Sequence, residues 1–271
     1  MLACLCSVAF VCISGAIGSA ASAERSGTAL VNIQVSDGKD FAAVRAMMDE
    51  LVKRGITATL WMSRTEYSPE QCSYLRMLSQ AGYEIAVKSE TDLRPLSYDE
   101  QLRLFGELAA AIKQCTGRSP SGFRATRFSW NEHTVEVGRK LGFYYFMGNI
   151  DGDPRFGDVP YFSRDGFLGL LGVTTARYPD GSTGILCDSP ASRNMSPQEF
   201  QDILFATIDQ RLAIGKPMVF EWHPASTSRP EEGNPWWQVF INFLDYLQSK
   251  GSAVRFTTGR DLVLQYDTCD C

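Results

Sequence analysis

Residues 28–62 read TALVNIQVSDGKDFAAVRAMMDELVKRGITATLWM, and this stretch decides the fold class. A β-rich apolar run over 28–35 ends in a polar turn at 36–38. Apolar residues then recur at helical spacing from Phe41 to Leu51, and a second β-rich run follows at 58–62. The order strand, loop, helix, strand is the repeating unit of a parallel α/β sheet.

The same alternation continues along the chain. Further strands are expected at 83–87, 122–124, 144–147, 218–222 and 253–256, and helix starts are expected at Ser68, Ser97, Asn131, Ser196 and Asn234. No Gly-rich dinucleotide fingerprint follows the first strand. The pattern favours a parallel sheet of about seven strands curled into a (β/α) barrel over an open doubly wound sheet. Residues 149–194 are rich in Gly, Pro, Asp and Ser, which predicts longer loops and shorter strands there.

Composition narrows the class of protein. The 271 residues hold 26 Lys+Arg against 31 Asp+Glu, for a formal net charge of -5. This balance argues against a nucleic-acid binder, which needs a cationic face for phosphate contacts. With 44% hydrophobic residues the chain has enough apolar material for a sizeable core, and its length suits one large α/β domain or two small ones.

The first 23 residues predict export. They carry no charged side chain, include an apolar stretch from Leu2 to Ile17 and end in Ala21-Ser22-Ala23, a small-residue cleavage pattern. We expect a signal peptide cleaved after Ala23, a globular domain over 24–271, and a secreted, periplasmic or cell-envelope location. An uncleaved anchor is the alternative, since the segment lacks a basic start. The five cysteines beyond it are an odd number, so one thiol should stay unpaired.

Polar and ionisable groups follow four of the expected strands. In a (β/α) barrel the loops after the strands meet at one face, so these groups should converge on one pocket. They are Ser36-Asp37-Gly38, Lys88-Ser89 with Asp92, Arg124 with Phe128, and Glu221-Trp222-His223-Pro224.

The order of these segments resembles the polysaccharide deacetylase family, also called the NodB homology domain. The segments that carry the resemblance are VNIQVSDG (31–38), ITATLWM (56–62), AGYEIAVKSETD (81–92), GFRATRFSWNEHTVEVGRKLGF (122–143) and PMVFEWHP (217–224). The resemblance implies a distorted (β/α) barrel that removes acetyl groups from N-acetylated sugars. It also implies a divalent metal held by one Asp and two His.

Compared position by position, the sequence departs from the family at the implied catalytic and metal-binding residues. Two of the three implied metal ligands have changed residue type. The implied general base falls on Ser36, the metal-binding Asp on Asp37, the two metal-binding His on Lys88 and Asp92, the motif Arg on Arg124 and the general-acid His on His223.

These changes predict that no metal cofactor is bound. A zinc site ordinarily needs three ligands, and a protonated Lys ammonium has no lone pair to offer. Only His133 and His223 exist in the chain, so no other imidazole pair replaces the missing ligands. We expect the Lys88 ammonium to stand where the metal would lie, neutralising Asp37 and also Asp92.

Glu221 and His223 are two residues apart on an expected strand, so both side chains face the same side. The carboxylate would favour the protonated imidazole, and Arg124 would orient an acidic neighbour. We take Asp37, Lys88, Arg124, Glu221 and His223 as the candidate catalytic residues.

Three functions remain open. The first is an exported deacetylase-like protein that binds or acts on N-acetylated glycans with its metal site lost. The second is a metal-independent, allantoinase-like amidohydrolase acting on a small amide, and the third is ordinary deacetylation with metal held by Asp37, Asp92 and water. Any activity would hydrolyse carbon–nitrogen amide bonds. We expect a glycan or small amide as partner, and neither nucleic acid nor a membrane beyond the N-terminal segment.

Overall fold

The computed structural model describes residues 28–36, 40–148, 161–162, 169–187, 195–224 and 233–267. The predicted signal segment, 1–23, and the candidate residue Asp37 lie outside the described residues. In the described part of the chain, no helix has the length and apolar composition needed to cross a membrane.

The first half of the chain alternates strand and helix as expected. Its elements are β1 (Ala29–Ser36), α1 (Phe41–Lys53), β2 (Ala58–Met62), α2 (Pro69–Gln80), β3 (Glu84–Ser89), α3 (Tyr98–Thr116), β4 (Gly122–Ala125), the short 3-10 helix η1 (Thr126–Phe128), α4 (Thr134–Leu141) and β5 (Tyr145–Met147).

The second half adds short strands before the pattern resumes. Its elements are β6 (Tyr161–Phe162), β7 (Gly169–Leu171), β8 (Thr175–Arg177), β9 (Thr183–Ile185), α5 (Pro197–Ala213), β10 (Met218–Trp222), α7 (Pro235–Ser249), the 3-10 turn η4 (Gly251–Ala253), β11 (Val254–Phe256) and α8 (Gly259–Asp267). The short strands β6 to β9 fall where the sequence predicts them.

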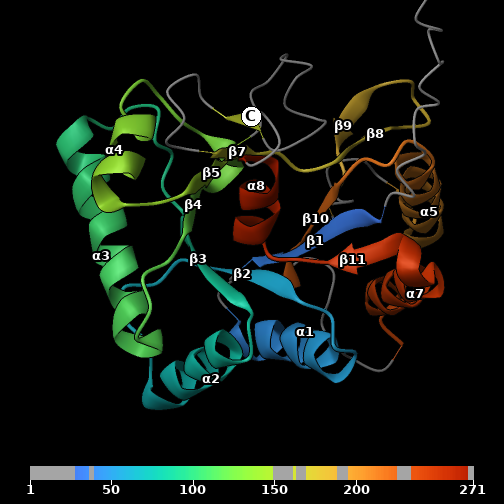
Figure 1. The fold of residues 1–271 in the computed structure, drawn as a ribbon, viewed down its shortest axis with the longest axis horizontal. Helices are drawn as coiled ribbons and strands as arrows, with labels where there is room; N and C mark the ends of the chain where they lie inside the picture. The colour runs from blue at the N-terminus through green and yellow to red at the C-terminus, as the bar shows by residue number, and fades with distance from the viewer. Residues whose placement is uncertain are drawn as a thin grey trace, which may run out of the picture.

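Nine strands form one sheet. Eight of them follow the order β10-β1-β2-β3-β4-β5-β7-β6, and the ninth, β11, also pairs with β1. All pairs are parallel except β6 with β7. The sheet curls into a half-barrel (Figure 1), which confirms the expected distorted (β/α) barrel. β8 and β9 form a separate antiparallel hairpin.

Two apolar layers fill the fold. Helices α1 to α5 and α7 surround the sheet, and their apolar faces pack on its outer side (Figure 1). Inside the curve, Leu262 and Val263 of α8 pack against Trp61, Tyr145 and Met147 from the strands. Because both faces of the strands are covered, β1, β2 and β3 are buried along their whole length.

The helix starts follow the sequence closely, with one exception. Ser68, Ser97 and Ser196 each form the predicted capping box. Asn131, expected to cap α4, lies three residues before that helix, which begins at Thr134 after His133. The side chain of Asn131 instead accepts the backbone N–H of His133 at 3.1 Å and bonds to the loop before α3.

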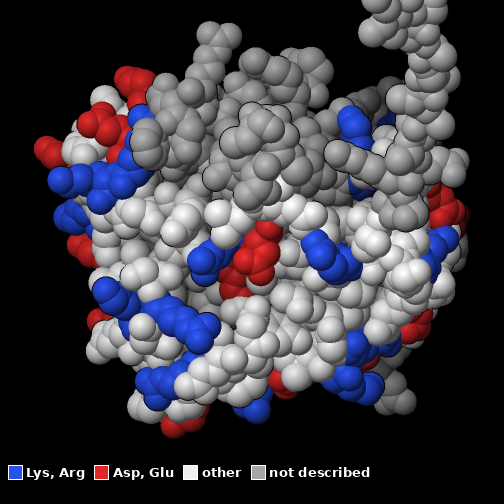
Figure 2. Space-filling model, viewed as in Figure 1, with Lys and Arg blue, Asp and Glu red and all other residues white. Residues whose placement is uncertain are grey.

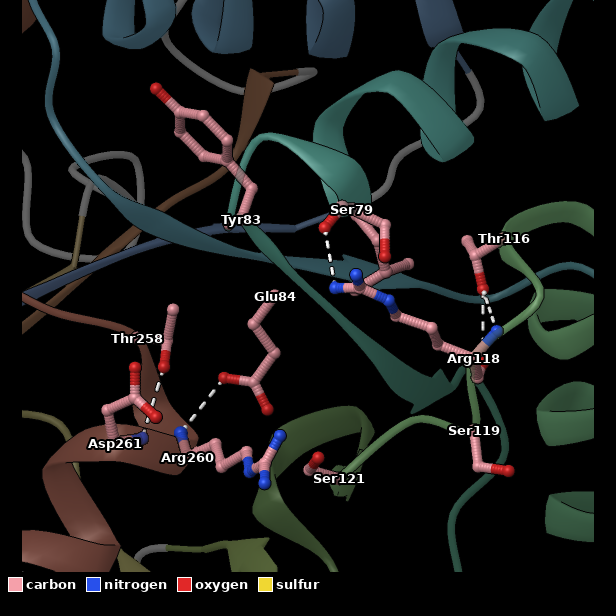
Figure 3. Close-up of a pocket in the computed structure, with 12 residues that line it drawn as sticks. Ser79, Tyr83, Glu84, Thr116, Arg118, Ser119, Ser121, Thr258, Arg260 and Asp261 are labelled. Atoms are coloured by element: carbon pink, nitrogen blue, oxygen red, sulfur yellow. Dashed lines mark hydrogen bonds between the residues drawn. The ribbon is translucent and has the colours of Figure 1, made fainter.

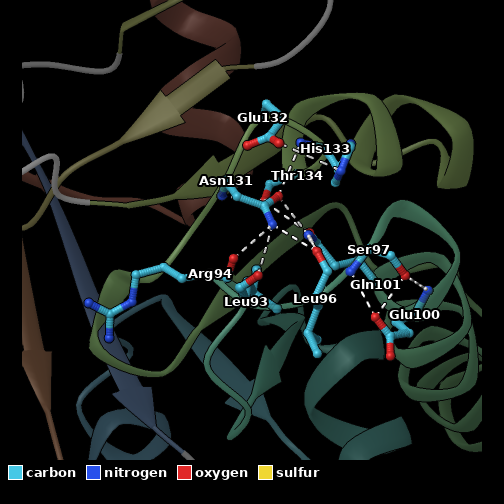
Figure 4. Close-up of polar contacts among 10 residues, drawn as sticks. All are labelled: Leu93, Arg94, Leu96, Ser97, Glu100, Gln101, Asn131, Glu132, His133 and Thr134. Carbon is cyan, nitrogen blue, oxygen red and sulfur yellow. Dashed lines mark hydrogen bonds and ion pairs between the residues drawn. The ribbon is translucent and has the colours of Figure 1, made fainter.

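The Asn131 side chain joins three segments (Figure 4). Its Nδ2 donates to the carbonyls of Leu93 and Leu96 at 3.0 and 2.8 Å, and its Oδ1 accepts from Gln101 Nε2 at 2.7 Å. Gln101 in turn accepts from the Thr134 hydroxyl at 2.9 Å. The loop after β3 is thereby fixed to α3 and to the start of α4.

A disulfide joins Cys72 of α2 to Cys115 of α3. Cys187 forms no disulfide with another described cysteine, and Cys269 and Cys271 lie outside the described residues, so the expected unpaired thiol stays a prediction. The link closes a loop of 43 residues and ties together the two helices that cover β3.

Candidate functional site

The carboxyl ends of β1 and β10 lie side by side and present Ser36 and Glu221. The register pairs Val35 with Trp222, so the residues that follow meet at the same edge of the sheet. The Ser36 hydroxyl donates to Glu221 Oε1 at 3.0 Å. The position at which the family resemblance implies a general base therefore holds a hydroxyl bonded to a buried carboxylate.

Arg124 reaches this pair from β4, across the interior of the half-barrel. Its guanidinium forms an ion pair with Glu221 and donates to the Ser36 hydroxyl oxygen. Its Cζ lies 5.1 Å from the centre of the Trp61 ring and 5.7 Å from that of Phe128. The side chains of Arg124 and Glu221 are each only 3% exposed, so the ion pair is sealed from solvent.

Glu221 is ionised despite this burial. Burial alone would raise its pKa, but the charges of Arg124 and His223, with their hydrogen bonds, hold the pKa of Glu221 well below its usual range. The cluster therefore has a fixed negative charge at its centre.

His223 connects this buried charge to solvent. Its Nε2 lies 3.0 Å from Glu221 Oε1, and its side chain is 28% exposed. Glu221 and His223 thus face the same side, as the two-residue spacing predicts. An imidazole oriented by a carboxylate can donate a hydrogen bond from a ring N–H to a carbonyl oxygen or a leaving group.

Lys88 stands level with Arg124 on the neighbouring strand. The two residues are register partners in β3 and β4, so their side chains leave the sheet on the same face. The Lys88 side chain is 10% exposed, and its Nζ lies 2.7 Å from Glu90 Oε1. Its predicted partner Asp37 lies outside the described residues.

Asp92 has another partner than the one expected. Both of its carboxylate oxygens accept from Arg94 Nε, at 2.9 and 3.0 Å, and the Arg94 side chain lowers the pKa of Asp92 strongly. Lys88 is paired with Glu90 instead. The negative charge of Asp92 is thus balanced at the rim of the site rather than by Lys88.

The donor set around Lys88 does not suit a divalent metal. The two positions that should supply imidazoles hold an ammonium without a lone pair and a carboxylate bound to Arg94. Across the described residues, no group of three or more His, Cys, Asp or Glu could hold a metal ion.

The turn after β4 is strained. Arg127 and Phe128 have φ values of 51° and 52°, in the left-handed region that non-glycine residues seldom adopt. This conformation lies three and four residues after Arg124, where the Phe128 ring packs against its guanidinium. Backbone strain of this kind concentrates at functional sites.

Gln34, one layer below the site, is a residue that the sequence reasoning missed. It donates to Asn32 Oδ1 at 2.8 Å and accepts from Trp61 Nε1 at 3.0 Å, so it fixes the ring on which Arg124 rests. The signal was present in β1, where Asn32, Gln34 and Ser36 alternate with Ile33 and Val35.

Cys187 was also not foreseen at the site. It forms an isolated parallel β-bridge with Glu221, so the segment after β9 borders the cluster.

A groove of about 450 Å³ opens next to the Lys88–Glu90 pair. It is lined by residues 63–66 after β2, by residues 89–91 at the end of β3 and just after it, and by Leu104 and Leu108 of α3. Glu90 connects the ion pair with the groove, because it pairs with Lys88 and also lines the groove.

Residues 26–146 match the family model described as polysaccharide deacetylase. The chain has the polysaccharide deacetylase fold. The resemblance seen in the sequence motifs is confirmed, with β1, β3 and β4 and the residues that they carry inside the matched region. A comparison with curated protein sequences gives no match.

Solved structures share this polysaccharide deacetylase fold over most of the chain. A Mycobacterium smegmatis protein assigned as a polysaccharide deacetylase is 18% identical, with a TM-score of 0.66 over 89% of this chain and 90% of that one. PuuE allantoinase is 15% identical, with a TM-score of 0.67 over 90% and 92%. A CE4 family pseudoenzyme from Bacillus anthracis is 11% identical, with a TM-score of 0.54 over 86% and 65%.

Proposed function

We propose that this protein is an exported binder of N-acetylated glycans that has the polysaccharide deacetylase fold without metal-dependent hydrolysis. The observation that carries the proposal is the buried Arg124–Glu221–His223 network, which stands opposite an ammonium at a position implied to bind metal. The network keeps a hydrogen-bond donor for an amide carbonyl, whereas the groups that would activate water have been replaced.

The loss of hydrolysis follows from two replacements. Ser36 has no useful basicity near neutral pH, and its hydroxyl already donates a hydrogen bond to Glu221. Lys88 repels a divalent cation and offers it no lone pair. A CE4 family pseudoenzyme is among the proteins of this fold. This supports the proposal that the present chain keeps the fold without the hydrolytic activity.

Recognition of the glycan would rest on His223. Its imidazole is partly exposed, and Glu221 holds it in one orientation, so it can donate to the carbonyl oxygen of an N-acetyl group. The groove beside Lys88 and Glu90 offers hydroxyl and charged groups for the sugar hydroxyls next to it.

The test is the binding of N-acetylglucosamine oligomers, measured by calorimetry. We expect saturable binding that weakens about tenfold or more in His223→Ala, since a charge-assisted hydrogen bond is lost. His133→Ala is the matched control, because it removes the other imidazole of the chain from the start of α4 and should leave the affinity unchanged.

Two further measurements decide between binder and enzyme. Metal analysis of the purified protein should show far less than one zinc per chain, and the oligomers should release no acetate with or without chelator. Stoichiometric zinc together with chelator-sensitive acetate release would contradict the proposal and restore ordinary deacetylation.

A metal-independent amidohydrolase is the second candidate. It is favoured by His223, which occupies the implied general-acid position and is oriented by a buried carboxylate. It is also favoured by the shared fold with an allantoinase. Hydrolysis of a small cyclic or linear amide that resists chelator and is lost in His223→Ala would support it over the binder.

Export is part of the proposal and has its own support. The Cys72–Cys115 disulfide is of a kind that persists in oxidising compartments. Expression in a secreting host, followed by N-terminal sequencing, should give a chain beginning at Glu24. A chain retained in the cytoplasm with its first 23 residues would contradict export.

A further inference from the structure

A second pocket lies at the opposite end of the sheet from the candidate site. Its residues come from the end of α2, the start of β3, the turn between α3 and β4, and the first turn of α8 (Figure 3). Glu84 begins β3, whereas Lys88 lies near the other end of the same strand. The pocket has a volume of about 120 Å³.

Side-chain donors that make no hydrogen bond to a described residue line this pocket. The Arg260 guanidinium contacts the Tyr144 ring at 5.4 Å and forms no ion pair with any described residue. Figure 3 shows it extending toward Ser121. The hydroxyls of Ser119 and Ser121 make no hydrogen bond to a residue that the structure describes.

A second guanidinium completes the donor set. Arg118 Nη1 donates to the carbonyl of Ser79 at 2.9 Å, which fixes the side chain over the end of α2 and leaves its other N–H groups for a ligand. Figure 2 shows basic side chains on both sides of the acidic ones on the face where α8 lies. The pocket is also lined by Glu84 and Asp261, and the Asp261 carboxylate lies away from both guanidiniums (Figure 3). The side of the pocket where the guanidiniums lie therefore disfavours a cation as its occupant.

Glu84 forms the inner wall. Its Oε2 accepts from the Thr59 hydroxyl and from the Arg260 backbone N–H, both at 3.0 Å. Its Oε1 is buried and makes no hydrogen bond of regular geometry among the described residues, while the Tyr145 side chain interacts with the same carboxyl group. Burial raises the pKa of Glu84 to about 7, so near neutral pH the group can take up a proton and act as a donor.

We propose that this pocket binds a small oxyanion, a carboxylate or a phosphate-like group, between the guanidiniums of Arg260 and Arg118 and the hydroxyl of Ser121. Such a group accepts from planar guanidiniums and hydroxyls at once, and its size suits the small volume. The site is separate from the proposed glycan site, and its test uses no glycan.

The experiment titrates inorganic phosphate, sulfate and acetate into the full-length protein by calorimetry. We expect one saturable site. Tighter binding of phosphate or sulfate than of acetate would indicate a tetrahedral ligand, and the reverse order would indicate a carboxylate. Arg260→Met should weaken binding about tenfold or more, and Ser121→Ala should weaken it less. Arg103→Met, which removes an exposed charge from the far end of α3, is the control and should leave binding unchanged.

A pH series with sulfate, whose charge is constant near neutrality, tests the role of Glu84. The charged and titratable groups that face Glu84 are Arg260 and Asp261 of α8, Arg118, Tyr83 and Tyr145. Affinity should rise several-fold from pH 8 to pH 6 because Glu84 gains a proton, and Glu84→Gln should bind with little pH dependence. Absence of saturation, equal weakening by Arg260→Met and Arg103→Met, or unchanged pH dependence in Glu84→Gln would each overturn the proposal.

Discussion

Arg124 is the residue on which the candidate site depends most. It neutralises Glu221 inside the half-barrel, bonds to Ser36 and is held between two aromatic rings. A buried ion pair of this kind contributes little net stability compared with apolar residues, but the loss of one partner leaves a charge without compensation.

Arg124→Met should therefore lower the free energy of unfolding by roughly 3–5 kcal/mol, because Glu221 would stay buried without its cation. Urea denaturation measures the loss. Arg103→Met, in an exposed pair on α3, should change the free energy by less than about 1 kcal/mol.

Coupling between the two residues gives a sharper check. The double variant Arg124→Met with Glu221→Gln should lose less stability than the sum of the two single losses. Additive losses would mean that the two side chains do not act as a pair.

At the scale of elements, the loop between β3 and α3 is held by hydrogen bonds to residues that are distant in the sequence. Asn131, which follows β4 and η1, supplies the hydrogen bonds that hold the carbonyls of Leu93 and Leu96 (Figure 4). Ser129, also after η1, accepts the backbone N–H of Leu93 at 2.9 Å. The loop that carries Asp92 and Arg94 thus depends on residues more than thirty positions away.

Asn131→Ala should lower the free energy of unfolding by roughly 2–3 kcal/mol, since buried carbonyls would lose their donors. Chemical denaturation and hydrogen exchange of the 93–97 amides would report the loss and its location. The control is Asn242→Ala, which removes a bond to Gln201 between α7 and α5 and an exposed bond from Gln238 within α7. Equal losses in the two variants would argue against a special role for Asn131.

At the scale of the whole molecule, the curl of the sheet creates the site. Ser36, Arg124 and Glu221 come from strands that are not all neighbours, because β2 and β3 separate β1 from β4. In a flat sheet Arg124 could not reach β1 and β10 at once. Inside the curve, α8 covers the interior and contributes its first turn to the second pocket.

The stability of the whole fold should depend on pH through Glu84. Its pKa is about 7 in the folded protein against 4.5 in the unfolded chain. Between these values the unfolded state has lost the proton and the folded state keeps it, so the free energy of unfolding falls as pH rises. The fall is roughly 3 kcal/mol, is complete near pH 7 and is absent below pH 4.5.

Denaturation curves recorded from pH 4.5 to pH 8 measure this effect. Glu84→Gln should flatten the profile over this window, and Glu107→Gln, an exposed carboxylate on α3, should not. The assignment fails if Glu84→Gln keeps the slope of the parent protein.

The amino-acid sequence by itself determined the alternation of strands and helices, the capping boxes, the family resemblance and the common face of Glu221 and His223. These features depend on local periodicity and on residue identity, which are visible along the chain. The sequence did not predict α8, the Lys88–Glu90 and Asp92–Arg94 pairs, or the role of Asn131.

Only the tertiary structure decided which charges meet. The sequence placed Arg124 at a strand exit with an acidic neighbour left unnamed, and the curled sheet assigned that neighbour as Glu221, ninety-seven positions along the chain. It also placed Glu84, an ordinary strand residue by sequence, in a buried wall with a raised pKa. Ion pairing and burial depend on distances between remote segments, and those distances are set by packing rather than by local sequence.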